Sequence, residues 1–153
     1  MKIKNKIIYI ISACILTGSI SIAVTCFMLN HQQREKYFEQ YFNKMHNQTT
    51  KIEFELRQTR TNQNSKVIVL TDDDAKAFFD CLKLKLPFNE FSTKGEQPFV
   101  INLYSNNKLI DILIFHGTSI RFTNAGVRDV IILPESQTIL KKFFVKHGIK
   151  FKD

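Results

Sequence analysis

An uncharged, mostly apolar run from Ile7 to Leu29 constrains this chain more than any other feature. In a helix that rises about 1.5 Å per residue, the run would reach roughly 34 Å, which is enough to cross a hydrocarbon core of about 30 Å. Lys2, Lys4 and Lys6 precede it without any acidic residue, and positive charge before a spanning helix keeps that end in the cytoplasm. The run therefore predicts a single transmembrane anchor with a cytoplasmic N-terminus, as in a single-pass protein of the bacterial inner membrane.

The predicted anchor divides the chain into four segments. Residues 1–6 would form a cytoplasmic tail and residues 7–29 the transmembrane helix. Residues 30–50 would form an amphipathic juxtamembrane helix or linker, and residues 51–153 a periplasmic or extracellular domain. The apolar core of a cleaved signal peptide usually has only about 7 to 15 residues. Because this run is longer, we expect the anchor to stay uncleaved.

Two cysteines in the run raise the alternative of lipid attachment. Residues 11–14, which end at Cys14, look like a bacterial lipobox, and residues 23–26, which end at Cys26, are a poorer match. Lipidation at Cys14 would leave a very short signal, and Thr25 stands where a small unbranched residue is required before Cys26. A buried cysteine more often acts as a small apolar side chain, so we favour an anchor without lipid.

The remaining sequence, about 120 residues, suits one domain with a single modest core. Residues 50–153 hold sixteen Lys and Arg against twelve Asp and Glu, a difference of +4, while the whole chain carries +8. Such a mild excess fits an anionic lipid surface or an acidic partner and is too small to indicate nucleic acid. Cys81 is the one cysteine outside the apolar run, so the domain cannot form an internal disulfide.

Strand and helix patterns follow one another in the first half of this domain. Apolar and charged residues alternate over 52–56, and a second strand is predicted at 66–70 after a polar loop at 58–65. Thr71 can cap a helix whose first turn carries three aspartates and whose apolar stripe runs to Leu86, before Pro87.

The second half predicts a meander of four strands and a final helix. The strands are expected at 99–104, 109–115, 120–123 and 127–133, separated by turns rich in Asn and Gly. Pro134 would begin the helix, which ends near His147 and Gly148. Its expected inward residues are Ile139, Leu140, Phe143 and Phe144. The predicted fold is therefore α+β, with the order two strands, helix, four strands, helix and a mainly antiparallel sheet covered by helices on one face.

Aromatic side chains recur on one face of the segment that follows the anchor. They are Tyr37, Phe38, Tyr41 and Phe42, with Met45 one turn later. Their spacing indicates a helix that continues from the anchor. One interpretation is a surface that contacts lipid headgroups or a partner helix. The other, which the sequence leaves equally open, is packing against the chain's own domain.

Lysines gather on the outer side of the last predicted helix. Lys141, Lys142 and Lys146 stand there, and Lys150 and Lys152 follow. They are candidates for contact with anionic phospholipid or with an acidic partner protein. The favoured alternative is a solvated helix face whose lysines also compensate the helix dipole.

Metal and cofactor sites have little support in the sequence. Asp72, Asp73 and Asp74 lack the spread spacing and glycine turn of a calcium loop, and they are better explained by the dipole of the helix they begin. The four histidines are scattered, without the spacing of a zinc site. No phosphate-binding glycine loop or hydrolase motif occurs. We expect no cofactor and no metal.

These observations favour a membrane-anchored interaction module without catalytic activity, with the lipid bilayer and a protein of the cell envelope as partners. An accessory subunit of an envelope complex and an immunity-type protein that blocks a toxin are two forms it could take. One alternative is an enzyme that uses Cys81, His116 and either Asp111 or Asp129.

A second alternative is a sensor of small ligands or lipids. Its binding surface would be the sheet face opposite the helices, because the strands over 99–115 are apolar on both faces. The residues expected on that face are Val100, Tyr104, Leu113 and Phe115.

Overall fold

A computed structural model describes most of the chain. It describes the backbone of residues 2–56, 66–88, 99–127 and 129–149, and side chains from residue 15 onward except at residues 56 and 66 and outside these ranges. The loops expected at 58–65 and 92–96 lie outside the described residues, and so do Lys150 and Lys152. The chain forms two compact units, Met1–Tyr37 and Phe38–Asp153.

The first unit belongs to a single long helix, α1, which runs from Lys2 to Gln48 and continues into the second unit. Large apolar side chains of its described part are between 51 % and 67 % exposed; they are Ile15, Leu16, Ile20, Ile22, Val24, Phe27, Met28 and Leu29. In the part of the chain that the structure describes, no helix is both long and apolar enough to cross a membrane. The transmembrane anchor at residues 7–29 therefore stays a prediction.

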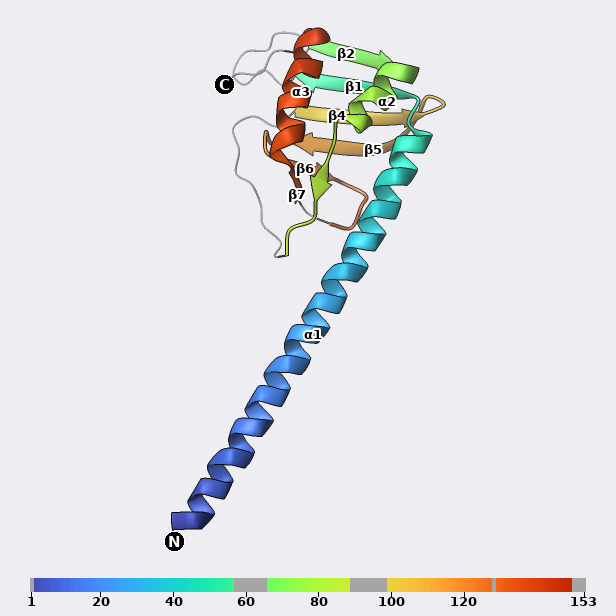
Figure 1. Cartoon of the computed structure of the whole chain (residues 1–153). Helices are drawn as coiled ribbons and strands as arrows, with labels where there is room; N and C mark the ends of the chain where they lie inside the picture. Colours follow the sequence, from blue (N-terminus) through green and yellow to red (C-terminus); the bar gives the residue numbers. More distant parts are fainter. Residues whose placement is uncertain (1, 57–65, 89–98, 128, 150–153) are drawn as a thin grey trace. The chain divides into compact units, whose positions relative to one another are not determined.

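The second unit is built on one antiparallel sheet of seven strands (Figure 1). The strands are β1 (Lys51–Leu56), β2 (Lys66–Thr71), β3 (Leu84–Lys85), β4 (Phe99–Ser105), β5 (Lys108–Phe115), β6 (Ser119–Phe122) and β7 (Asp129–Ile132). Their order across the sheet is β2-β1-β4-β5-β6-β7-β3, and every neighbouring pair is antiparallel. The predicted α+β class and antiparallel sheet are confirmed.

Turn chemistry explains the hairpin between β4 and β5. Asn106 and Asn107 connect the two strands, and their φ angles are 49° and 65°. A two-residue hairpin turn needs positive φ at both central positions, and asparagine tolerates this conformation better than most residues. The turn brings two long strands together, and these hold the middle of the sheet.

All three helices pack against the same face of this sheet. Figure 1 shows α2 (Asp72–Asp80) and α3 (Pro134–Lys146) on one side of the strands. The ring of Phe54 on β1 lies 5.5 Å from Phe78 of α2 and 5.7 Å from Phe144 of α3, between ring centroids. On β6, the ring centroid of Phe122 lies 5.4 Å from that of Phe38 on α1. The core is thus a layer of aromatic rings between one sheet face and the helices.

The segment after α2 differs from the prediction. The helix ends at Asp80 instead of continuing to Leu86, and Leu84–Lys85 forms the short strand β3 beside β7. Leu82 and Leu86 are still buried, but they alternate with lysines at the two-residue period of a strand. The helical interpretation of the stripe was wrong beyond Asp80, because the spacing of Leu82 and Leu86 fits the period of a helix as well as that of a strand.

Two further positions differ from expectation, one at the start of α2 and one within α3. Thr71 is the last residue of β2 and makes no side-chain hydrogen bond to cap α2. Instead Asp72 enters the helix with φ of 48°. In α3, Ile139 is 45 % exposed rather than inward, and Ser136 takes the inner position, where its hydroxyl oxygen accepts a hydrogen bond from the Lys83 backbone N–H at 2.7 Å.

Replacing Phe144 by alanine tests the aromatic core. The ring is fully buried and lies beside Phe54 and Phe115. We expect Phe144→Ala to lower the free energy of unfolding by about 3–5 kcal/mol in urea denaturation followed by circular dichroism. Val145 is the next residue and is 74 % exposed, so Val145→Ala serves as the control and should change stability by less than about 0.5 kcal/mol. Equal losses in the two variants would contradict this core.

Candidate functional site

The candidate site is the sheet face that the helices do not cover, called the open face below. Side chains alternate between the two faces of a strand. The register of the pairs therefore places every second residue of the paired segments of β2, β1, β4, β5, β6 and β7 on this face. Its members include Lys51, Glu53, Glu55, Val67, Val69, Thr71, Val100, Asn102, Tyr104, Ile112, Ile114, Ser119, Arg121, Asp129 and Ile131. The surface therefore mixes apolar side chains with a band of polar ones.

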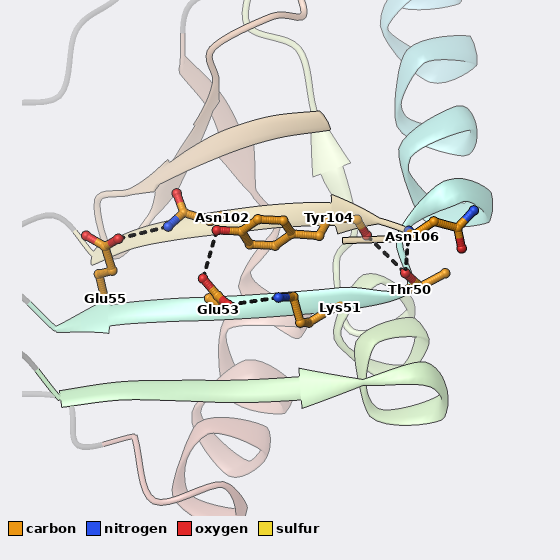
Figure 2. A network of polar contacts seen from close by, with 7 residues as sticks. All are labelled: Thr50, Lys51, Glu53, Glu55, Asn102, Tyr104 and Asn106. Carbon is orange, nitrogen blue, oxygen red and sulfur yellow. Dashed lines mark hydrogen bonds and ion pairs between the residues drawn. The ribbon is translucent and has the colours of Figure 1, made fainter. Parts of the chain in front are cut away.

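A cross-strand network joins the polar residues of β1 and β4 (Figure 2). The Tyr104 hydroxyl donates a hydrogen bond to the Glu53 carboxylate at 2.8 Å, and the Lys51 ammonium lies 3.0 Å from the same carboxylate. The Lys51 Nζ atom also lies 4.2 Å from the centroid of the Tyr104 ring, a cation–π arrangement. These three side chains hold one another in fixed positions on the open face.

The network changes the acidity of two of its members. The hydrogen bond from Tyr104, followed by the one from Lys51, lowers the pKa of Glu53 below its ordinary value of 4.5. The same hydrogen bond raises the pKa of Tyr104, because ionising the phenol would remove the donor and place a second negative charge beside the carboxylate. At neutral pH the pair therefore stays a carboxylate and a neutral phenol.

Two further pairs extend the polar band across the open face. The Asn102 Nδ2 group donates to the Glu55 Oε1 atom at 2.9 Å. On the neighbouring strands, the Arg121 guanidinium donates from Nε and Nη2 to the two oxygens of Asp129, both at 2.9 Å. Such a bidentate pair fixes the plane of the guanidinium. The open face thus carries paired polar groups, of which Asn102 and Asp129 are themselves buried, beside aliphatic side chains.

The aromatic residues of α1 contact the domain. Phe38 is buried against Phe122, and Phe42 packs between Phe122 and Phe79. The Tyr41 hydroxyl donates to the Asp111 carboxylate at 2.6 Å. For these residues the structure shows the packing alternative rather than a free surface, whereas Tyr37 is 54 % exposed.

Asp111 is a buried polar centre below this helix. Besides the Tyr41 hydroxyl, its carboxylate accepts hydrogen bonds from the Thr123 hydroxyl at 2.8 Å and the Asn124 backbone N–H at 3.1 Å. Its own strand contributes the Ile112 backbone N–H at 2.7 Å. The carboxylate therefore has partners from α1, from β5 and from the turn after β6, and it links these three elements.

The residues of the catalytic alternative lie in separate surroundings. Asp111 lies on the covered face and Asp129 on the open face, each engaged in the hydrogen bonds given above. Burial, followed by the charge of Asp80, raises the pKa of Cys81, which favours the thiol over the nucleophilic thiolate. Both ring nitrogens of His116 are buried without a hydrogen-bond partner among the described residues.

The lysines and the residues of the sensor alternative are also located. Lys141, Lys142 and Lys146 are exposed on α3, and the Lys146 ammonium lies 3.7 Å from Asp74. Val100 and Tyr104 lie on the open face, as expected, but the other two sensor residues do not. Leu113 and Phe115 pair with Ile101 and Phe99 and are buried under the helices. In the part of the chain described, no group of three His, Cys, Asp or Glu side chains could hold a metal ion.

Most of the polar band was not singled out from the sequence. The alternation of Ile52 and Phe54 with Glu53 and Glu55 places the two glutamates on one face, so half of the signal was present. Their partners on β4 could not be identified from the sequence, because β4 lies beside β1 in the sheet but is separated from it by more than forty residues along the chain. Cross-strand pairs of this kind depend on strand order, which local periodicity does not encode.

Acid should weaken the domain through Glu53. A carboxyl group whose pKa is lowered in the folded state stabilises it fully above the ordinary value of 4.5, and the contribution is lost as pH falls through the lower folded pKa. Urea denaturation at a series of acidic pH values should therefore show a smaller loss of stability for Glu53→Gln than for the wild type. Glu39→Gln, which changes an exposed glutamate of α1, is the control. The same pH slope in wild type and Glu53→Gln would refute the role of this carboxylate.

Comparisons with known proteins add no relative. No protein-family model matches the chain, and neither a curated protein nor a solved structure does. The function is therefore inferred from the residues and contacts described above.

Proposed function

We propose that this protein is a membrane-anchored interaction module without catalytic activity. In this proposal residues 7–29 span the bacterial inner membrane with the N-terminus in the cytoplasm, and the α+β domain faces the periplasm or the cell exterior. Its partner is a protein of the cell envelope, either a complex to which this chain is accessory or a toxin that it blocks. The observation that carries the proposal is the open face, which has positioned polar groups and no helix among the described residues over it.

The composition of the open face supports a protein partner. Interfaces that form and dissociate combine aliphatic area with satisfied polar groups, and tyrosine and arginine often contribute most of their binding energy. Tyr104 and Arg121 stand on this face with their polar groups held by Glu53 and Asp129. Because these side chains are already fixed, ordering them on binding would cost little conformational entropy.

The sequence of α1 supports the membrane location. The run from Ile7 to Leu29 contains no charged residue and follows three lysines. The apolar side chains from Ile15 to Leu29 that the structure describes are more than half exposed, and exposing so much apolar area to water is unfavourable. Exposed Tyr37, which follows this run, and the lysines of α3 would then be candidates for contact with headgroups.

Arginines within the apolar run should release the protein from membranes. Each arginine near the centre of a spanning helix costs about 2.5–3.5 kcal/mol on insertion scales. We expect the wild type to stay in the pellet after alkaline extraction of membranes and the double variant Ile20→Arg/Val24→Arg to appear in the supernatant. Ile20→Leu/Val24→Leu is the matched control and should stay in the pellet.

Cysteine labelling in intact cells tests the orientation of the anchor. With Cys14, Cys26 and Cys81 replaced, a cysteine introduced at exposed Lys142 should react with an impermeant thiol reagent in intact cells, whereas one at Lys4 should react only after lysis. Extraction of the wild type, or labelling at Lys4 in intact cells, would exclude the proposed anchor.

Photocrosslinking tests whether the open face binds a partner. A benzophenone amino acid at Val100 or Ile114 should capture one defined envelope protein, because both positions lie in the middle of the open face. The control position is Val145 on α3, which is 74 % exposed and belongs to the opposite side of the domain. Equal products at Val145 and at the open-face positions would contradict the proposed surface.

A further inference from the structure

The strand β2 forms one edge of the sheet, and its outer backbone groups can be identified. The Asp72 backbone N–H donates to the Thr50 carbonyl at 2.9 Å, which fixes the phase of hydrogen bonding between β1 and β2. Bonded and non-bonded pairs alternate along an antiparallel ladder. The Leu70 and Ile68 backbones therefore face β1, and those of Val67, Val69 and Thr71 face away from the sheet.

After Lys66, the first residue of β2, the described residues of this edge lack the sequence features that usually protect an exposed strand. From Val67 to Thr71 it contains no charged residue, no proline and no glycine, and devices of that kind normally prevent pairing with another strand. Val67 and Val69 are 48 % and 50 % exposed. The opposite edge of the sheet differs, because β3 has only two residues and one of them is exposed Lys85. Among the described residues, β2 is thus the edge that is better suited to strand addition.

We propose that a second copy of this chain pairs with β2, so that two sheets join edge to edge about a twofold axis perpendicular to them. Hydrogen bonds between the two copies can form only in a register that places Val67, Val69 and Thr71 of one copy opposite residues of the same set in the other. The register with the longest overlap places Val69 opposite Val69 of the second copy and Val67 opposite Thr71. This inference does not rest on the proposed membrane location or on the envelope partner.

The side chains favour a second copy over an unrelated strand. Pairing the same strand antiparallel to itself keeps each residue on its own face, so the valines of both copies form one apolar cluster on the joined open faces. No like charges meet between Val67 and Thr71. The same register brings position 66 opposite position 72, where the sequence has lysine and aspartate respectively.

The mass of the full chain in detergent micelles, measured by light scattering with size-exclusion chromatography, tests the dimer. Val69→Pro is the informative variant, because the Val69 N–H faces away from β1 and proline is tolerated on an edge strand in that position. We expect a dimer for the wild type and a dimer dissociation constant raised about tenfold or more for Val69→Pro and Val69→Lys. Val145→Lys, a change at an exposed site on α3, should leave the dimer intact, and circular dichroism should show that all variants fold.

Disulfide crosslinking tests the register in a background without the native cysteines. Residues directly opposite in a bonded antiparallel pair have Cα atoms about 5.5 Å apart, within the range of about 4.4–6.8 Å that a disulfide accepts. Val69→Cys should therefore crosslink to itself. Val67→Cys should not, since its two copies would lie roughly 13 Å apart, but it should crosslink with Thr71→Cys when the two variants are mixed.

Three results would overturn the proposal. The first is a wild-type chain that is monomeric at tens of micromolar, which would leave β2 to a strand from another protein or to none. The second is a dimer that survives both Val69→Pro and Val69→Lys, which would place the contact elsewhere on the chain. The third is crosslinking of equal yield at Val67 and Val69, which would indicate collision without a register.

Discussion

Burial on a single face of the sheet is the constraint on which the rest of this structure depends. The domain has no disulfide to hold it, and its rings meet where β1, β5 and β6 contact the three helices, with Phe144 and Phe122 at the two centres of contact. Because every described helix is used on that face, the other face carries polar pairs that satisfy one another, such as Glu53 with Tyr104. The open face and the β2 edge, for which we propose binding, are the surfaces that core formation does not use.

Local patterns predicted much of the fold because the chain follows them closely where one face is buried. The alternation at Ile52 and Phe54 and the paired asparagines at 106 and 107 each specify a local structure with little competition. Prediction failed where two periods fit the same residues. Leu82 and Leu86 continue the helical stripe as well as they fit the alternation of a strand, and the choice depends on β7, which pairs with Leu84. Ser136 is buried and Ile139 is exposed, because the Ser136 hydroxyl accepts a hydrogen bond from the Lys83 backbone N–H, a contact between residues far apart in sequence.

The candidate site was less predictable than the fold for a different physical reason. Two of its pairs join residues far apart in sequence: Tyr104 and Glu53 are separated by 51 positions and Asn102 and Glu55 by 47. Sequence periodicity places a side chain on a face but does not identify the strand beside it. Tyr41 and Phe38 could be assigned equally to a lipid surface or to a core, because an amphipathic helix satisfies either with the same spacing. Only the positions of Phe122 and Asp111 decide between them.

The shared helix α1 has a practical consequence for anyone who wishes to shorten this protein. A boundary drawn after the apolar helix, at the first strand, would look natural from the sequence. It would also remove Phe38, Tyr41 and Met45, expose the ring of Phe122 and leave the Asp111 carboxylate without its phenol donor. The smallest fragment that retains its own interior therefore begins upstream of Phe38, inside the helix. In this chain the last turns of α1 are at the same time the first part of the domain.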